Sequence, residues 1–258
     1  MTPILRYLNR VYRFAGQSLF WILFGLIGIV VGFIVLPLVL LFVRNPSRRQ
    51  VTARNIISAC FSLFVWTACR MRLITCRVTG MEHCDPDRGQ LILANHPTLI
   101  DVVILISLFP QVDCVIKEAV TKNPVMRTAA GTANYISNSE PADLLDSCTD
   151  ALRSGASLLL FPEGTRSVAG KALKFKPGAA EVAIRADAEI LPVVVDCRPQ
   201  FLAKHEPWYY IPLRAPHFDI RILAPLNPGN LIPAGTGNRH ARHMLNTALQ
   251  ELFKANLT

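Results

Sequence analysis

From about residue 71 onward, short apolar runs alternate with segments of helical periodicity. This alternation is typical of a wound α/β sheet flanked by helices. The apolar runs predict strands at residues 91–94, 114–116, 135–137, 157–161, 190–195 and 218–222. The helical segments predict helices at residues 100–108, 124–130, 142–154, 179–186 and 239–255. We therefore predict one sheet-centred α/β domain over residues 71–258.

The N-terminal part of the chain has a different pattern. Residues 14–43 contain no charged side chain, and about 20 such residues in a helix already cross the hydrocarbon core of a bilayer. The stretch is too long for the apolar region of a signal peptide. It predicts a retained membrane helix, and Gly28 with Gly32 offers a small face at which a second helix could approach.

A second apolar stretch, residues 56–69, ends at Arg70. It is short for a membrane span but suits a helix lying in the membrane interface. Residues 1–70 are therefore predicted to be a helical anchor that precedes the α/β domain.

Composition and charge support this division. The chain is 51% hydrophobic and 17% charged, whereas about a quarter of the residues of a soluble domain are charged. Ten of its 27 lysines and arginines lie in residues 1–81, which contain no acidic residue, so the rest carries 17 basic against 18 acidic groups. Basic residues beside apolar helices favour anionic lipid headgroups, whereas a nucleic-acid binder needs a basic folded domain. We expect a membrane partner and no nucleic acid.

Arginines flank both ends of residues 14–43: Arg6, Arg10 and Arg13 before the stretch, and Arg44, Arg48, Arg49 and Arg54 after it. The four that follow the stretch favour a cytoplasmic α/β domain by the positive-inside rule. We therefore expect the protein at the inner (cytoplasmic) membrane, with the catalytic domain on the cytoplasmic side.

The first candidate chemistry follows the strand predicted at residues 91–94. Residues 95–101 read NHPTLID, and loops at the carboxyl ends of strands are where open α/β sheets place their ligands. Histidine takes up a proton near neutral pH, and Asp101 lies five residues after His96 near a helix start. The pair predicts a general base with its orienting carboxylate, for which a substrate hydroxyl supplies the nucleophile. The alternative is a turn histidine beside a helix-capping aspartate.

A second polar loop, residues 161–167 (FPEGTRS), follows another buried strand. Arg166 offers a planar fork of donors to a phosphate or carboxylate, and Gly164 permits close backbone approach. Glu163 is predicted either to accept a hydrogen bond from an acceptor hydroxyl or to hold Arg166. The alternative is a salt-bridged turn.

Together these residues resemble the glycerolipid acyltransferases, which include the lysophosphatidate acyltransferases. The family's first motif is a histidine and an aspartate separated by four residues, matched by His96 and Asp101, and its third is matched by residues 161–166. The resemblance continues through Lys117-Glu118, residues 175–179 (FKPGA) and Leu191-Pro192-Val193, over roughly residues 75 to 225.

The resemblance implies an α/β domain seated on the membrane, acyl-CoA or acyl carrier protein as the acyl donor, and a lysolipid acceptor. His96 is then the base that deprotonates the acceptor hydroxyl, and Asp101 orients it. The implied substrate-binding residues are Glu163, Gly164, Thr165, Arg166, Lys117 and Lys176. No metal or organic cofactor is expected.

One position departs from the family pattern. The second motif normally carries an arginine after an apolar strand, and here Ser137 or Asn138 stands in its place. Losing a charge-assisted phosphate contact costs about 1.5 to 3 kcal/mol, so an acceptor without a phosphomonoester, such as a lyso-aminolipid or another long-chain product, stays open. A non-catalytic lipid-binding protein on the same fold is a second alternative. A hydrolase would need a Gly-x-Ser-x-Gly nucleophile turn, which the sequence lacks.

Overall fold

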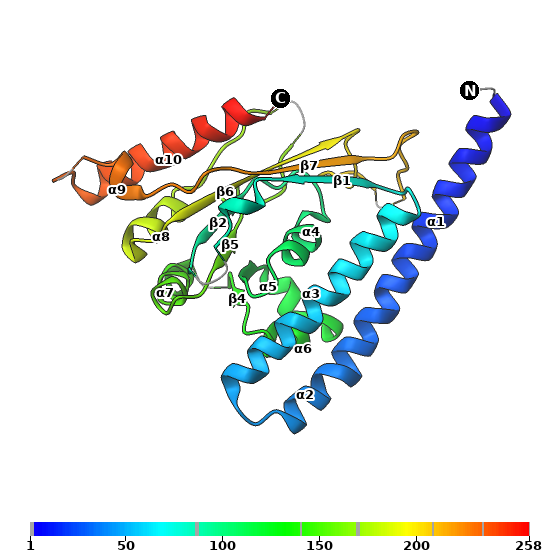
Figure 1. The fold of residues 1–258 in the computed structure, drawn as a ribbon, viewed down its shortest axis with the longest axis horizontal. Helices are drawn as coiled ribbons and strands as arrows, with labels where there is room; N and C mark the ends of the chain where they lie inside the picture. The colour runs from blue at the N-terminus through cyan, green and yellow to red at the C-terminus, as the bar shows by residue number, and fades with distance from the viewer. Residues whose placement is uncertain are drawn as a thin grey trace.

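The computed structural model describes residues 3–85, 88–139, 141–168, 171–207, 209–233 and 235–257. An N-terminal helical hairpin precedes an α/β domain (Figure 1). The hairpin consists of α1 (Pro3–Val30), the π-helical η1 (Val31–Val35), α2 (Leu36–Phe42) and α3 (Pro46–Arg70). The strands are β1 (Thr75–Thr79), β2 (Leu91–Ala94), β3 (Asp113–Ile116), β4 (Ile136–Ser137), β5 (Leu158–Leu160), β6 (Ile190–Arg198) and β7 (His217–Ile222). The remaining helices are η2 (Met81–His83), α4 (Asp101–Leu108), α5 (Glu118–Lys122), α6 (Pro124–Thr132), α7 (Pro141–Arg153), α8 (Gly178–Ala186), α9 (Pro228–Leu231) and α10 (Asn238–Asn256).

The strands form one seven-stranded sheet in the order β1-β7-β6-β2-β5-β3-β4 across the described residues. Strands β6, β2, β5, β3 and β4 are mutually parallel, and β7 runs antiparallel to β6. Because parallel neighbours share their direction, β2, β5, β3 and β4 all end at one edge of the sheet. The sequence predicted this α/β architecture, and the structure confirms it.

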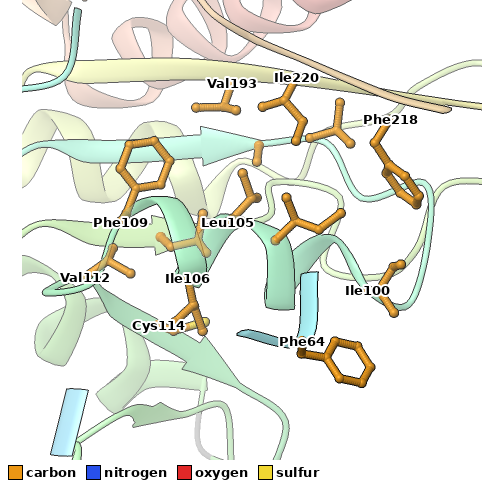
Figure 2. Packing of buried hydrophobic residues seen from close by; sticks show 14 of the residues in the cluster. Phe64, Ile100, Leu105, Ile106, Phe109, Val112, Cys114, Val193, Phe218 and Ile220 are labelled. Atoms are coloured by element: carbon orange, nitrogen blue, oxygen red, sulfur yellow. The ribbon is translucent and has the colours of Figure 1, made fainter. Parts of the chain in front are cut away.

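Both faces of the sheet are covered, which explains why its central strands are uninterrupted apolar runs rather than alternating ones. Ile92 and Ala94 point toward a cluster shared with α3 and α4, whereas Leu91 and Leu93 point toward α7, α8 and α10. Figure 2 shows the first cluster, in which Phe64 of α3 lies with α4 side chains and sheet residues. The hairpin is therefore part of the core of the α/β domain.

The two arms of the hairpin run antiparallel and side by side (Figure 1). Phe20 of α1 and Phe64 of α3 have ring centroids 3.6 Å apart, and Phe24 lies 4.6 Å from Phe64. The π-helical turn η1 lies just before Pro37. In a regular helix a proline has no N–H to donate, and its ring clashes with the carbonyl of the residue four positions earlier. Both arms are long and apolar enough to cross a membrane: Ile4–Phe42, with 39 residues, and Pro46–Arg70, with 25.

The first arm of the hairpin contacts the α/β domain near Gly16 and near Gly32. Gly16 lies against Leu73, and Gly32 lies so close to α6 that a Cβ there would be 2.4 Å from the Val125 carbonyl oxygen. The small face predicted at Gly28 and Gly32 is therefore used against α6 rather than against the second apolar helix. The opposite side of α1 keeps its large apolar side chains exposed.

Two of the arginines that were expected to contact lipid headgroups are instead buried, and they join the hairpin to the α/β domain. Arg54 of α3 forms an ion pair with Asp113 of β3 and donates to the Ala133 carbonyl at 3.0 Å. Arg13 of α1 donates to the Leu73 carbonyl at 3.0 Å and to the Pro212 carbonyl at 3.2 Å. The expectation of headgroup contact is thus wrong for Arg13 and Arg54, because each guanidinium satisfies carbonyls where the hairpin meets the domain. Arg6, Arg10, Arg44 and Arg48 are exposed.

The elements predicted within residues 71–258 are all present, with ends shifted by at most three residues. Strand β1 was not predicted, because it is an edge strand without a fully buried residue and so lacks an apolar run. The second apolar helix was predicted too short. It begins at Pro46, where the side chain of Asn45 accepts a hydrogen bond from the Arg48 N–H at 3.1 Å, as a helix cap does.

Candidate active site

The candidate site lies at the edge where β2 and β5 end. Residues 95–101 follow β2, and residues 161–167 follow β5, its hydrogen-bonded neighbour. The parallel pairing therefore brings together two loops that are more than 60 positions apart in sequence. The sequence placed each loop at the end of a strand, and the structure shows that these two strands are neighbours.

His96 and Asp101 are paired. The imidazole Nδ1 lies 3.0 Å from Asp101 Oδ2, and the carboxylate is fully buried. Asp101 also accepts from the Thr98 N–H at 2.7 Å and from the Thr98 hydroxyl at 2.5 Å. A carboxylate can only accept, so Nδ1 is the protonated ring nitrogen in the neutral imidazole, and Nε2 is left to receive a proton. The N-cap residue of α4, Ile100, makes no side-chain cap hydrogen bond, and the Asp101 carboxylate lies against the imidazole.

The start of the histidine loop is anchored to the neighbouring strand. The buried Asn95 amide donates to the Val195 carbonyl at 2.7 Å, and its Oδ1 accepts from the Val195 N–H at 2.8 Å. This reciprocal pair satisfies both polar ends of the amide. It holds the backbone directly before His96 against β6.

Glu163 joins the two loops. Its Oε1 accepts from the His96 N–H at 2.9 Å and from the Ser167 hydroxyl at 2.8 Å, while the Ser167 N–H donates to the His96 carbonyl at 2.7 Å. Burial raises the pKa of Glu163 above its ordinary value, and the hydrogen bonds from His96 and Ser167 oppose this shift. Glu163 thus holds the backbone of the histidine rather than the side chain of Arg166.

The imidazole is held on its face as well as at Nδ1. The rings of His96 and Phe161 stack with centroids 4.3 Å apart and an interplanar angle of 27°. The His96 side chain remains 15% exposed. A ring fixed by stacking and by one hydrogen bond, with part of its surface open, is suited to receive a proton from a bound hydroxyl.

Gly164 and Lys176 lie against each other. Gly164 has φ +66°, and a Cβ at this position would lie 2.8 Å from Lys176 Nζ. A side chain would therefore meet both backbone strain and the ammonium group. The Lys176 N–H donates to the Pro162 carbonyl at 2.8 Å, so this exposed lysine is brought to the second loop as its predicted role requires. Thr165 is half-buried in the same loop.

Arg166 is partly committed to the protein itself. Its Nη1 donates to the carbonyls of Leu202, at 2.9 Å, and Ala203, at 3.1 Å. The Leu202 carbonyl also accepts from the Leu99 N–H at 3.1 Å. Arg166 therefore ties the second loop to the β6–β7 connection, which in turn contacts the histidine loop. Any headgroup contact uses its remaining N–H groups.

Lys117 and Asn138 occupy the next two strand ends. Lys117 is exposed directly after β3, and Asn138 follows β4, its neighbour. The Asn138 side-chain oxygen accepts from the Glu118 N–H at 3.0 Å. The position at which the family pattern has an arginine thus caps the turn after Lys117 instead. The binding role of Lys117 stays a prediction.

Sequence reasoning did not identify several residues that position the site. Thr98 and Ser167 lie inside the two motifs, so their hydroxyls beside carboxylates were a signal that could have been used. Leu202 and Ala203 act through backbone carbonyls roughly 100 residues after His96, and no side-chain pattern marks them.

Comparison with known proteins agrees with this geometry. The family model described as Acyltransferase matches residues 75–196. A putative 1-acyl-sn-glycerol-3-phosphate acyltransferase of Caenorhabditis elegans is 30% identical over 151 residues, covering 55% of this chain and 52% of that protein. The 1-acyl-sn-glycerol-3-phosphate acyltransferase alpha of Mus musculus is 26% identical over 171 residues, covering 62% and 58%. The chain thus spans about half the length of these relatives.

The fold also has a solved counterpart. The crystal structure of the 1-acyl-sn-glycerophosphate acyltransferase from Thermotoga maritima matches with a TM-score of 0.72 at 21% identity, covering 100% of this chain and 97% of that one. The likeness therefore includes the helical hairpin. Residues 75–196 of this chain are thus similar to the Acyltransferase family model, and the relatives that match are named 1-acyl-sn-glycerol-3-phosphate acyltransferases.

Proposed function

We propose that the protein is a membrane-associated O-acyltransferase. It transfers a fatty acyl group from the thioester of acyl-CoA or acyl carrier protein to the hydroxyl of a lysolipid such as 1-acyl-glycerol-3-phosphate. The observation that carries this proposal is the His96–Asp101 pair, with Nδ1 held at 3.0 Å and no protein nucleophile required. The family match over residues 75–196 supports the same reaction class.

In the proposed reaction, His96 Nε2 takes the proton of the acceptor hydroxyl while the oxygen attacks the thioester carbonyl carbon. A C–O bond forms and the C–S bond breaks. The imidazolium then returns the proton to the departing thiolate, which leaves as a thiol. Asp101 stabilises the imidazolium through Nδ1, so the imidazole stays in the productive tautomer throughout.

Holding the reactants accounts for the rest of the rate enhancement. Thioester transfer to an alcohol is thermodynamically favourable, so catalysis requires a base, orientation, and donors for the developing oxyanion. Lys117, Lys176 and the free N–H groups of Arg166 supply cations around the strand ends for the acceptor headgroup or the phosphates of the donor. Gly164, bare of a side chain, leaves room for close approach.

Membrane association is proposed from the hairpin. Its arms are apolar enough to enter a bilayer, and the outward side of α1 exposes residues such as Ile22, Leu26 and Phe33. Because α1 and α3 also pack on the α/β domain, we propose that the hairpin seats the domain directly on the membrane surface. A cytoplasmic position for the domain follows from the flanking arginines Arg44 and Arg48.

A specific observation favours a second acceptor class. Asn138 is neutral, and the buried Ser137 hydroxyl has no hydrogen-bond partner in the part of the chain that the structure describes. Uncharged polar groups at this strand end suit an acceptor without a phosphomonoester better than a dianion. A lyso-aminolipid or another long-chain hydroxyl product is therefore the alternative substrate for the same reaction.

The test is transfer from a labelled acyl thioester, CoA or carrier protein, by purified protein in detergent. Lysophosphatidate and a panel of phosphate-free lysolipids serve as acceptors, with His96→Ala as the control. Transfer that His96→Ala abolishes supports the proposal, and the preferred acceptor decides between the two classes. Absence of transfer with every donor and acceptor, while the protein binds lipid, would favour the non-catalytic lipid-binding alternative.

A further inference from the structure

The connection between β6 and β7 carries exposed apolar side chains close together. Tyr209, Tyr210 and Leu213 are 59%, 47% and 58% exposed. Single exposed apolar residues are ordinary on protein surfaces, but a group of them beside a further apolar surface marks an interaction site. The neighbouring surface here is the first part of α1.

Hydrogen bonds fix this connection to α1. The Asn9 side-chain amide donates to the Leu213 carbonyl at 3.1 Å, and Arg13 Nε donates to the Pro212 carbonyl at 3.2 Å. Residues 209–214 therefore lie beside the segment of α1 from Arg6 to Arg13. In this segment α1 also exposes Tyr7 and Tyr12, at 69% and 51%.

Exposed cations surround the tyrosines. Arg6 and Arg10 of α1 and Arg214 of the connection are exposed, and none of them belongs to an ion pair in the described part of the chain. Tyrosine gathers at the headgroup level of bilayers, and arginine there attracts anionic lipid. The tyrosines and arginines of α1 lie directly before the uncharged stretch of the hairpin, residues 14–43.

We propose that residues 209–214 are a second membrane-binding element, which rests in the headgroup layer of a bilayer containing anionic phospholipid. Its tyrosine rings and Leu213 enter the boundary between headgroups and acyl chains, and Arg214 pairs with lipid phosphates. The element lies about 200 residues after the part of α1 that it contacts. This inference rests on the membrane association included in the proposed function.

The element belongs to the connection that also contacts the two active-site loops. The same β6–β7 connection holds the active-site loops, because the Leu202 carbonyl accepts from the Leu99 N–H and from Arg166. The bilayer surface and the catalytic histidine loop are thus joined through one short connection.

Fluorescence quenching in vesicles tests the proposal on the full-length chain. In a Trp208→Phe background, Trp21 and Trp66 report on the hairpin, and Tyr210→Trp adds one reporter to the connection. Met81→Trp is the matched control, because Met81 is similarly exposed, at 42%. It follows the carboxyl end of β1, whereas the β6–β7 connection lies at the amino end of that strand. The probe is a vesicle of mixed zwitterionic and anionic phospholipid, with the acyl chains brominated near the headgroup.

We expect vesicles to shift the added emission of Tyr210→Trp to shorter wavelength and the brominated lipid to quench it, with neither change for Met81→Trp. If the emission shift and the quenching are equal for the two variants, residues 209–214 are not a second membrane-binding element. If the background protein is quenched but Tyr210→Trp adds no quenchable emission, the hairpin enters the bilayer and only this inference fails. If the background protein is not quenched either, the proposed membrane association fails with it.

The contribution of charge is tested in the same assay. Adding Arg214→Gln to Tyr210→Trp should reduce quenching in vesicles with anionic lipid and leave quenching in purely zwitterionic vesicles unchanged. An equal effect in both kinds of vesicle would show that Arg214 does not recognise anionic headgroups. That result would overturn the anionic part of the proposal.

Discussion

The Oε1 atom of Glu163 accepts a hydrogen bond from the backbone N–H of His96 at 2.9 Å, so the acid of the second loop holds the histidine of the first. Ser167 closes the arrangement, because its hydroxyl donates to the same carboxylate oxygen and its N–H donates to the His96 carbonyl. Two loops that end neighbouring strands thereby form one rigid unit.

Replacing His96 with Ala should lower acyl transfer by about 100-fold or more, because this removes the general base. Steady-state rates with saturating donor and acceptor measure the effect. His240→Ala, on an exposed face of α10, is the matched control and should leave the rate unchanged. A His96→Ala rate close to that of the parent would rule out the proposed mechanism.

Replacing Asp101 with Asn should lower kcat by roughly 10² to 10⁴-fold, because the amide no longer fixes the Nδ1–H tautomer or stabilises the imidazolium. Thr98→Val removes only one of the donors to that carboxylate and should cost about tenfold or less. Comparing kcat for the two variants checks the order. A larger loss for Thr98→Val than for Asp101→Asn would contradict the orienting role of Asp101.

Glu163→Gln should change how stability depends on pH. Burial raises the folded-state pKa of Glu163 above its unfolded value, so the folded protein holds this proton more tightly than the unfolded chain. The parent therefore loses stability from this group as the pH rises from its unfolded pKa through the raised folded pKa. The melting temperature of Glu163→Gln, relative to the parent, should rise across that window. A constant difference from pH 4 to pH 7 would contradict the raised pKa.

Arg166→Ala should lower transfer to phosphate-bearing and to phosphate-free acceptors alike. The reason is that Arg166 braces the carbonyls of Leu202 and Ala203, which position the histidine loop whatever the acceptor. Measuring kcat and KM separately for both acceptors distinguishes the roles. A loss confined to the KM of the phosphate-bearing acceptor would instead assign Arg166 to headgroup binding alone.

Asp113→Ala should destabilise the protein by about 3 to 5 kcal/mol, because it leaves the Arg54 guanidinium buried without its carboxylate. Combining it with Arg54→Met should restore part of the loss. Thermal unfolding in detergent measures both variants. Glu251→Ala breaks the exposed Lys254–Glu251 pair and should cost less than about 1 kcal/mol. Equal losses for Asp113→Ala and Glu251→Ala would contradict the fastening role of Arg54.

The strands and the two motif loops were predictable from the sequence for a simple reason. A central strand covered on both faces must be an unbroken apolar run, and Leu91–Ala94 is one. Strand β1 escaped prediction because its register with β7, not its own composition, makes it a strand. The sequence shows Asn138 near the position where the family pattern has a positively charged arginine. Only the structure shows that its side chain accepts a hydrogen bond from the Glu118 N–H.

The division between residues 1–70 and 71–258 stays a prediction, but the core crosses it. Phe64 and Ala68 of α3 are buried in the same cluster as α4 and the sheet. Removing residues 1–70 would therefore expose apolar surface of the α/β domain as well as remove an anchor. A membrane-release experiment by truncation needs a folding control for that reason.

The sequence by itself determined the fold class and the presence of two apolar helices, because these depend on local pattern: strand runs and helix length. His96 as the base and Asp101 as its carboxylate stay predictions that rest on a five-residue spacing. Only the tertiary structure decided the functions of the arginines. Arg13, Arg54 and Arg166 have the same side chain as Arg48, yet the first three donate to carbonyls and Arg48 stays exposed. A guanidinium bonds to whatever acceptors the fold brings near it, and those acceptors are backbone groups that leave no mark on the sequence.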